Sequence, residues 1–120
     1  MPKTIFVIDD NENLLTVLGI ALQQAGYHVE SASNGAEALE HLATVQPDVV
    51  ISDVMMPHMD GVQFFKQIQE QLSYEGVPII LMTALSRKPW FADLEAEGAV
   101  IIQKPFEVEQ LVSLIEMYAA

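Results

Sequence analysis

The sequence contains no cysteine, and this absence removes several kinds of chemistry at once. Disulfides, thiolate metal sites, iron–sulfur clusters and cysteine nucleophiles are all excluded. Basic residues are also few, because 5 Lys and Arg stand against 17 Asp and Glu, for a formal net charge of −12. Phosphate contacts from Lys and Arg supply most of the affinity of proteins for nucleic acid, so direct nucleic-acid binding is not expected. Cations and basic protein surfaces suit this charge better.

Long hydrophobic runs are missing too. A membrane-spanning helix needs about 20 apolar residues, and the longest run here, at residues 77–85, is interrupted by Pro78. Near the N-terminus, only four apolar residues precede Asp9 and Asp10, too few for the core of a secretory signal. We therefore expect a soluble, cytoplasmic protein without membrane insertion.

The size and composition predict one folded domain over residues 1–120. Domains cluster near about 100–150 residues, and the chain has 120. Hydrophobic residues make up 51% of it, which is too many for a disordered acidic segment. The chain is therefore expected to fold around a single apolar core.

Short apolar runs alternate with helical patterns along the whole sequence. Strand-like runs lie at residues 4–8, 49–51, 79–82 and 100–102, with a weaker one at 28–31. Such uninterrupted runs are typical of strands that are covered on both faces. Helical spacing of apolar residues covers 14–25, begins again at Asn34 (with a capping box to Glu37) and near Asp60, and returns at 86–97 and 107–118. Five βα units of this kind predict an α/β fold, a parallel sheet with helices on both faces in a three-layer sandwich.

Polar residues follow four of the five predicted strands. In an open parallel sheet the ligand site lies beyond the carboxyl ends of the strands, and the residues found there are Asp9 and Asp10, Asp53, Thr83 and Lys104. Each has a simpler interpretation when taken alone, since Asp10 or Thr83 can cap the next helix and Lys104 can be a solvated loop cation. Three carboxylates on one edge, however, repel one another unless a cation lies among them.

The ligand types indicate which cation this is. Oxygen ligands without cysteine favour a hard ion, and Mg²⁺ fits best because it binds one or two carboxylates together with waters and phosphate oxygens. A threonine hydroxyl and a lysine ammonium beside it can bind an anion, so the set describes a phosphoryl site. Asp53, at the end of the central strand, is the natural nucleophile for an acyl phosphate, and Asp9 and Asp10 would hold the metal.

The ordered set of motifs resembles the receiver domains of two-component response regulators. The matching segments are IFVIDD at 5–10, DVMMP at 53–57 followed by DG at 60–61, TA at 83–84 and KPF at 104–106. Each motif alone is a weak signal, but their order is specific and the resemblance covers residues 4–119. It implies a flavodoxin-like (βα)5 fold with strand order 2-1-3-4-5.

The resemblance also implies a role for each residue of the site. Asp53 would accept a phosphoryl group from a sensor histidine kinase or a histidine phosphotransfer protein. Asp10 and Asp53 would bind Mg²⁺ directly and Asp9 through water, and the Met55 carbonyl would be a further ligand. Such a domain signals, and it catalyses only its own phosphorylation and dephosphorylation.

The resemblance also implies that Thr83 and Lys104 would bind the phosphoryl oxygens. Receivers of this kind have a cis peptide bond before the proline that follows the lysine, and we expect one at Lys104-Pro105. A dimer that forms on phosphorylation is also compatible with the family. The chain ends just after the last predicted helix, as in a stand-alone receiver or in a fragment of a longer regulator or hybrid kinase.

One position departs from the family pattern. Many receivers have Tyr or Phe three residues before the lysine as an aromatic switch, but Ile101 stands there. Switching is therefore expected to come from Thr83 and the loop at residues 85–89. Of the nearby residues, we predict that Trp90 and Phe91 are half-packed on the fourth helix and that His58 is an exposed loop residue and not a metal ligand.

Three other functions compete with a phosphorylated receiver. A flavin or nucleotide binder would have a Gly/Ser/Thr-rich phosphate loop after the first strand, where this chain has the acidic segment DDNE at 9–12. An aspartate-nucleophile phosphatase would have a DxD pair after the first strand, which is missing. A degenerate receiver that only docks to other proteins remains open, although every residue of the phosphorylation site is present.

Overall fold

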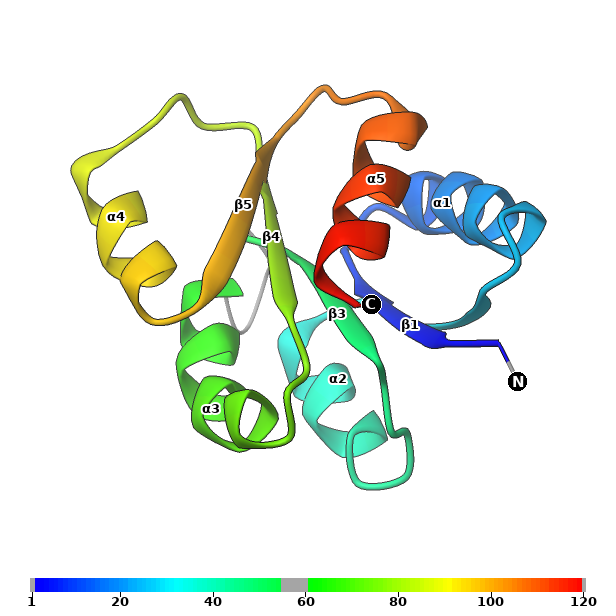
Figure 1. The fold of residues 1–120 in the computed structure, drawn as a ribbon, viewed down its shortest axis with the longest axis horizontal. Coiled ribbons are helices and arrows are strands. Elements are labelled where there is room, and N and C mark those ends of the chain that lie inside the picture. Colours follow the sequence, from blue (N-terminus) through cyan, green and yellow to red (C-terminus); the bar gives the residue numbers. More distant parts are fainter. Residues whose placement is uncertain (1, 55–60, 120) are drawn as a thin grey trace.

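The computed structural model describes residues 2–54 and 61–119, apart from the side chains of residues 61 and 70–74. The predictions for Met55 and His58 therefore lie outside the described residues. Strands and helices alternate five times along the chain (Figure 1). The strands are β1 (Thr4–Ile8), β2 (His28–Ala32), β3 (Val49–Asp53), β4 (Ile79–Thr83) and β5 (Ala99–Gln103). The helices are α1 (Glu12–Gln24), α2 (Gly35–His41), α3 (Gly61–Tyr74), α4 (Pro89–Ala96) and α5 (Val108–Tyr118).

The five strands form one sheet in the order β2-β1-β3-β4-β5, and every neighbouring pair is parallel. The predicted fold class and strand order are confirmed. All residues of β3 and β4 are buried, as uninterrupted apolar runs predict for strands covered on both faces. The edge strand β2 has exposed and half-buried positions among its residues, which explains its weaker signal in the sequence.

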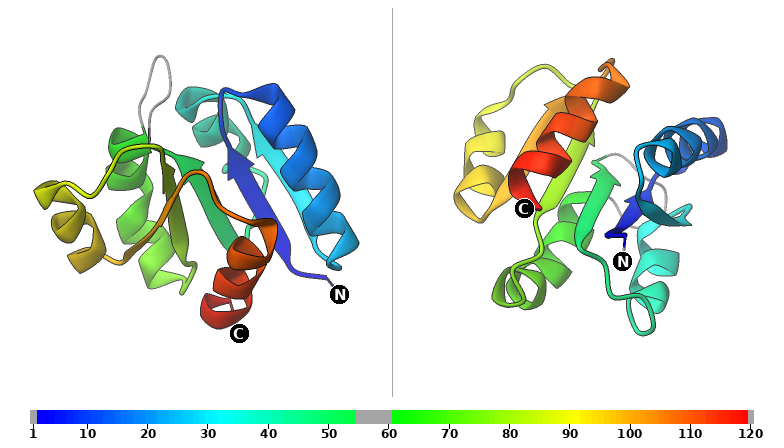
Figure 2. Two further views of the ribbon diagram at one scale, coloured as in Figure 1. Left: turned by 90° about the horizontal axis from the view of Figure 1, so that it is seen from above. Right: turned by 45° about the vertical axis from the view of Figure 1, so that its right-hand side comes forward.

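Helices cover both faces of the sheet (Figure 2). One apolar cluster lies under α1 and α5, and the other lies under α2, α3 and α4. Because side chains alternate between the faces of a strand, neighbours in β1 belong to different clusters: Ile5 and Val7 pack on the α1 and α5 side, and Phe6 and Ile8 on the other. The helices therefore pack on both faces of the sheet and hold the strand ends in place.

Side chains define where the helices begin. Asn11 caps α1 by accepting a hydrogen bond from the Leu14 amide, and Asn34 caps α2 in the same way through the Glu37 amide, at 2.8 Å. A capping box also needs a hydrogen bond from the backbone amide of Asn34 to the Glu37 side chain. The Glu37 carboxylate instead accepts a hydrogen bond from the Ser33 hydroxyl. A complete capping box occurs at the start of α5, which the sequence analysis missed.

The fourth helix is shorter than predicted at both ends, since it spans Pro89–Ala96 and not residues 86–97. Proline suits the first turn because it has no N–H to leave unpaired. It also disfavours helical backbone in the residue before it, and Lys88 is extended, with φ −115° and ψ 154°. Residues 84–88 consequently form a loop between Thr83 and the helix.

Candidate functional site

The carboxyl ends of the strands bring the predicted site residues together. Asp9 directly follows β1, Asp53 and Thr83 end β3 and β4, and Lys104 directly follows β5. These strands are parallel and in register, so their ends share one edge of the sheet. Asp10 completes the set from the turn before α1, where Asn11 is the helix cap. The helix-cap interpretation of Asp10 is therefore wrong.

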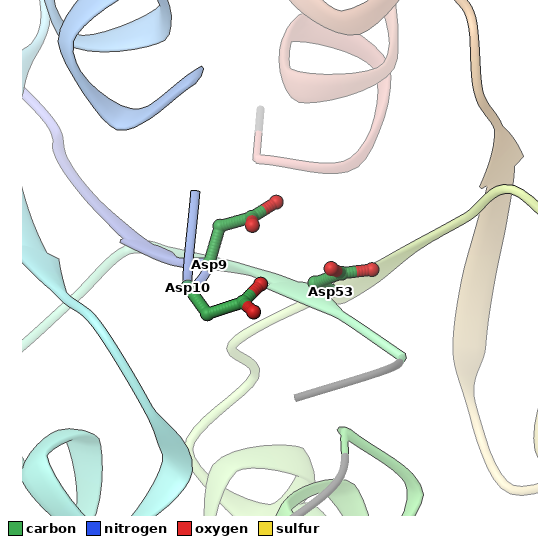
Figure 3. Close-up of side chains that lie close together, drawn as sticks. All are labelled: Asp9, Asp10 and Asp53. Atoms are coloured by element: carbon green, nitrogen blue, oxygen red, sulfur yellow. The ribbon is translucent and has the colours of Figure 1, made fainter. Parts of the chain in front are cut away.

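The three carboxylates form a tight cluster (Figure 3). One carboxylate oxygen each from Asp9, Asp10 and Asp53 lies within 4.8 Å of the others. Asp9 is fully buried, Asp53 is 8% exposed and Asp10 is exposed. Charges at this separation repel strongly where water is largely excluded. The cluster could therefore hold a cation, and its oxygen ligands are of the type that Mg²⁺ takes.

Lys104 reaches the cluster from the end of the edge strand β5. Its Nζ lies 3.0 Å from Asp9 Oδ2 and 3.5 Å from Asp53 Oδ2, and the side chain is only 23% exposed. The Lys104-Pro105 peptide bond is cis, as predicted. Lys104 is therefore a partly buried charge bound to the site, and the alternative of a solvated loop cation is wrong.

Asp9 uses both of its carboxylate oxygens within the protein. Oδ1 accepts a hydrogen bond from the Asn11 amide at 2.9 Å, and Oδ2 accepts the one from Lys104. Asp10 is exposed and projects from the turn beside it. Asp9 is accordingly tied in place, whereas Asp10 faces solvent at the mouth of the site.

The hydroxyl of Thr83 belongs to the same edge and is fully buried. Thr83 Oγ1 accepts a hydrogen bond from the Leu85 amide at 3.0 Å, and the Thr83 carbonyl accepts from the Lys104 amide. Because α4 begins only at Pro89, Thr83 does not cap that helix. Its side chain is thus available to the site as a hydrogen-bonding group at the end of β4.

Ile101, which stands where many receivers have an aromatic switch residue, is part of the hydrophobic packing. Ile101 is half-buried in β5 and packs against the apolar cluster under α2, α3 and α4.

On α4 the two neighbouring aromatic residues differ in exposure, since Phe91 is 2% exposed and Trp90 is 37% exposed. The prediction that both are half-packed is correct for Trp90 and wrong for Phe91, which faces the core.

Gln103 is a polar residue beside the site that the sequence pattern did not single out. It ends β5, and its side-chain amide donates a hydrogen bond to the Leu85 carbonyl oxygen at 3.1 Å. The sequence signal that could have identified it is a polar residue at the end of an apolar strand, directly before Lys104.

Arg87 lies further along the loop that leads to α4. Its hydrogen bonds to the Glu95 carboxylate on α4 lower the pKa of Glu95 below its ordinary value.

An apolar groove of about 500 Å³ opens beside the acidic cluster. It lies between α1 and the loop after β5, and Lys104 forms part of its wall. Val17 on its α1 side is 56% exposed. A groove of this kind next to a charged site can receive a partner that brings a reactive group to the carboxylates.

Comparison with known proteins identifies the family. Residues 5–116 match the response regulator receiver domain, and the chain belongs to this family of two-component signalling domains. The chain is 39% identical over 113 residues to the DNA-binding transcriptional regulator NtrC of Escherichia coli K12, a match that covers 93% of this chain and 24% of NtrC. The chain thus spans about a quarter of the length of that relative.

Two solved structures show the same architecture. The chemotaxis response regulator CheY4 of Vibrio cholerae is 33% identical with a TM-score of 0.88, over 98% of this chain and 99% of that chain. The Thermotoga maritima response regulator TrrA, solved in complex with Mg(2+)-BeF, is 32% identical with a TM-score of 0.83, over 97% of this chain and 98% of that chain.

Among the helices of residues 2–54 and 61–119, none is long and apolar enough to cross a membrane.

Proposed function

We propose that the chain accepts a phosphoryl group on Asp53 from a phosphohistidine of a sensor histidine kinase or a histidine phosphotransfer protein. The observation that carries this proposal is the meeting of three carboxylates with Lys104 at the strand ends, where the Lys104 ammonium lies within 3.5 Å of Asp53. The expected consequence is a change in protein binding. Two-component phosphohistidine donors act in the cytoplasm, and we place this chain there.

In the transfer, a carboxylate oxygen of Asp53 forms a bond to phosphorus while the phosphorus–nitrogen bond of the phosphohistidine breaks. The electron pair of the broken bond stays on the ring nitrogen, and the other ring nitrogen of the phosphohistidine carries a proton, so the products are an aspartyl phosphate and a neutral histidine. Lys104 offsets the charge on the phosphoryl oxygens, and the Thr83 hydroxyl donates a hydrogen bond to one of them. Both groups come from neighbouring strand ends, so the sheet fixes their backbones beside Asp53 before the donor arrives.

The acidic cluster fits Mg²⁺, because it offers only oxygen ligands from carboxylates within 4.8 Å of one another. We assign Asp10 and Asp53 as direct ligands and Asp9 as a ligand through water, since both oxygens of Asp9 already accept hydrogen bonds. The Met55 carbonyl, a further proposed ligand, lies outside the described residues. When bound, Mg²⁺ neutralises charge on the phosphoryl oxygens.

Acetyl phosphate separates this function from that of a degenerate docking module. Intact-mass measurement with Mg²⁺ should show the addition of one phosphoryl group, and chelation of the metal should prevent it. A wild-type chain that gains no phosphoryl group from acetyl phosphate or from its cognate kinase would favour the docking module and contradict our proposal.

The apolar groove beside the cluster is the docking site we propose for the donor protein. Val17→Asp places a charge in the groove and should slow phosphotransfer from the cognate kinase by about tenfold or more, as expected for loss of an interface anchor. Labelling by acetyl phosphate should stay within about twofold of wild type, because that donor needs no docking surface. Met117→Asp, at an exposed position on α5, is the matched control. Equal losses with both donors would show damage to the site and not to docking.

Signal transmission should involve the loop after Thr83 and not the position of Ile101. On binding of beryllofluoride with Mg²⁺, we expect strong changes in the backbone amide signals of residues 83–91 and weak changes at residues 100–103. Ile101 has no ring to move and is packed in the sheet, so the loop must carry the shift between states. Trp90 fluorescence should report it. Larger changes centred on Ile101, with unmoved loop signals, would contradict this.

The dimer that phosphorylation is proposed to induce can be measured on the same samples. Sedimentation with and without beryllofluoride reports whether the switched state associates.

A further inference from the structure

The loop between β4 and α4 is held to the end of β5 by one side chain. Gln103 Nε2 donates to the Leu85 carbonyl oxygen at 3.1 Å. Gln103 is paired with Thr83 in the register of the sheet, so its backbone is fixed beside the strand end that precedes the loop. The exposed Gln103 side chain thus ties the loop, residues 84–88, to a rigid strand.

The same leucine also holds the Thr83 hydroxyl. Its amide donates to Thr83 Oγ1 at 3.0 Å, while its carbonyl oxygen accepts from Gln103. Two hydrogen bonds therefore connect Gln103 to Thr83 through Leu85. Because Thr83 is fully buried, its hydroxyl has little contact with solvent, and the Leu85 amide is a hydrogen-bond donor to it within the protein.

The far end of the loop is fixed on α4. The Arg87 guanidinium donates two hydrogen bonds to the Glu95 carboxylate, one of them at 3.1 Å. Its central carbon lies 5.9 Å from the centre of the buried Phe91 ring. With Arg87 attached to α4 and Leu85 attached to β5, the loop is anchored at two points. A movement of Leu85 away from the end of β5 would therefore stretch the Gln103 bond.

We propose that Gln103 is a positioning residue for Thr83, and that its bond to Leu85 restrains the turn of the Thr83 hydroxyl toward a phosphoryl group on Asp53. This inference rests on the proposed function. A hydroxyl can accept one hydrogen bond and donate another, so Thr83 keeps its Leu85 partner during the approach only if Leu85 moves with it. That movement costs the Gln103 bond, and the bond therefore favours the unphosphorylated conformation.

Gln103→Met tests this assignment, because it keeps the length of the side chain and removes the donor. We expect acetyl phosphate to label Asp53 about two- to fivefold faster than in wild type, the effect of one net hydrogen bond on an equilibrium. Beryllofluoride affinity should rise by a similar factor, and Mg²⁺ affinity should not change. In wild type, the side-chain amide signals of Gln103 should shift when beryllofluoride binds. Gln23→Met, at an exposed position on α1, is the matched control.

The outcomes separate this inference from the proposed function. If wild type is labelled on Asp53 but Gln103→Met is labelled at the same rate or more slowly, the inference is overturned and the proposed function stands. Equal acceleration in Gln23→Met, or a change in Mg²⁺ affinity that accounts for the faster labelling, overturns the inference as well. If wild type takes no phosphoryl group, both fail together. Gln103→Leu, which also lacks the donor, replaces Gln103→Met if that variant folds poorly.

Discussion

Asp53→Asn should abolish labelling by acetyl phosphate in the presence of Mg²⁺. The amide lacks the anionic oxygen that attacks phosphorus, and the neighbouring carboxylates cannot replace it: Asp9 is engaged with Asn11 and Lys104, and Asp10 lies at the exposed mouth of the site. We expect a loss of at least a hundredfold, the scale on which removal of a directly reacting group acts. Intact mass and peptide mapping measure it.

The variant should remain folded, because it removes one of three mutually repelling charges. Its thermal midpoint without Mg²⁺ should be no lower than that of wild type, and this separates lost chemistry from lost structure. Asp93→Asn makes the same chemical change at an exposed position on α4 and should be labelled like wild type. Undiminished labelling of Asp53→Asn at the same stoichiometry would overturn the assignment of Asp53.

Lys104→Met should have two opposite effects on the site. Phosphorylation by acetyl phosphate should slow by about 10²–10³-fold, because the variant removes a preorganised positive charge from the developing phosphoryl oxygens. Mg²⁺ should bind more tightly, since the ammonium that lies 3.0 Å from Asp9 and 3.5 Å from Asp53 no longer competes for the same carboxylates. Calorimetric titration with Mg²⁺ and labelling rates measure the two effects.

The folding stability of Lys104→Met should depend on the same charges. Without Mg²⁺, Lys104→Met should be less stable than wild type, because a buried Asp9 loses its charged partner. Saturating Mg²⁺ should restore more stability to the variant than to wild type. Lys66→Met, at an exposed position on α3, should show none of these changes. Weaker Mg²⁺ binding together with normal labelling would mean that Lys104 supports the metal site and not the phosphoryl group.

The strands and the site edge could be predicted because their physical causes are local. Strands buried on both faces need uninterrupted apolar runs, and the residue that ends such a run in a parallel sheet must lie at the ligand edge. The sequence therefore predicts that Asp9, Asp53, Thr83 and Lys104 share this edge. The edge strand β2 gave a weaker signal because water covers part of it.

Contacts between distant side chains could not be predicted in the same way. The separation of Lys104 from Asp9 and Asp53 depends on sheet twist and loop path, which residue spacing does not specify. The bond from Gln103 to Leu85 joins residues 18 positions apart, and it forms because the register sets Gln103 beside Thr83. The later start of the fourth helix, by contrast, could have been derived from Pro89 alone.

The chain ends have a consequence for any sequence joined to them. The Lys3 ammonium contacts the carbonyl oxygen of Ala119, so these two residues are neighbours at the end of the sheet where β1 begins. A five-residue strand is about 17 Å long, so a fused segment leaves the domain roughly that far from the phosphoryl acceptor. Fluorophores at residues 2 and 118, which leave the Lys3 contact intact, should accordingly report a constant distance, an internal standard against which movement of the β4–α4 loop can be measured.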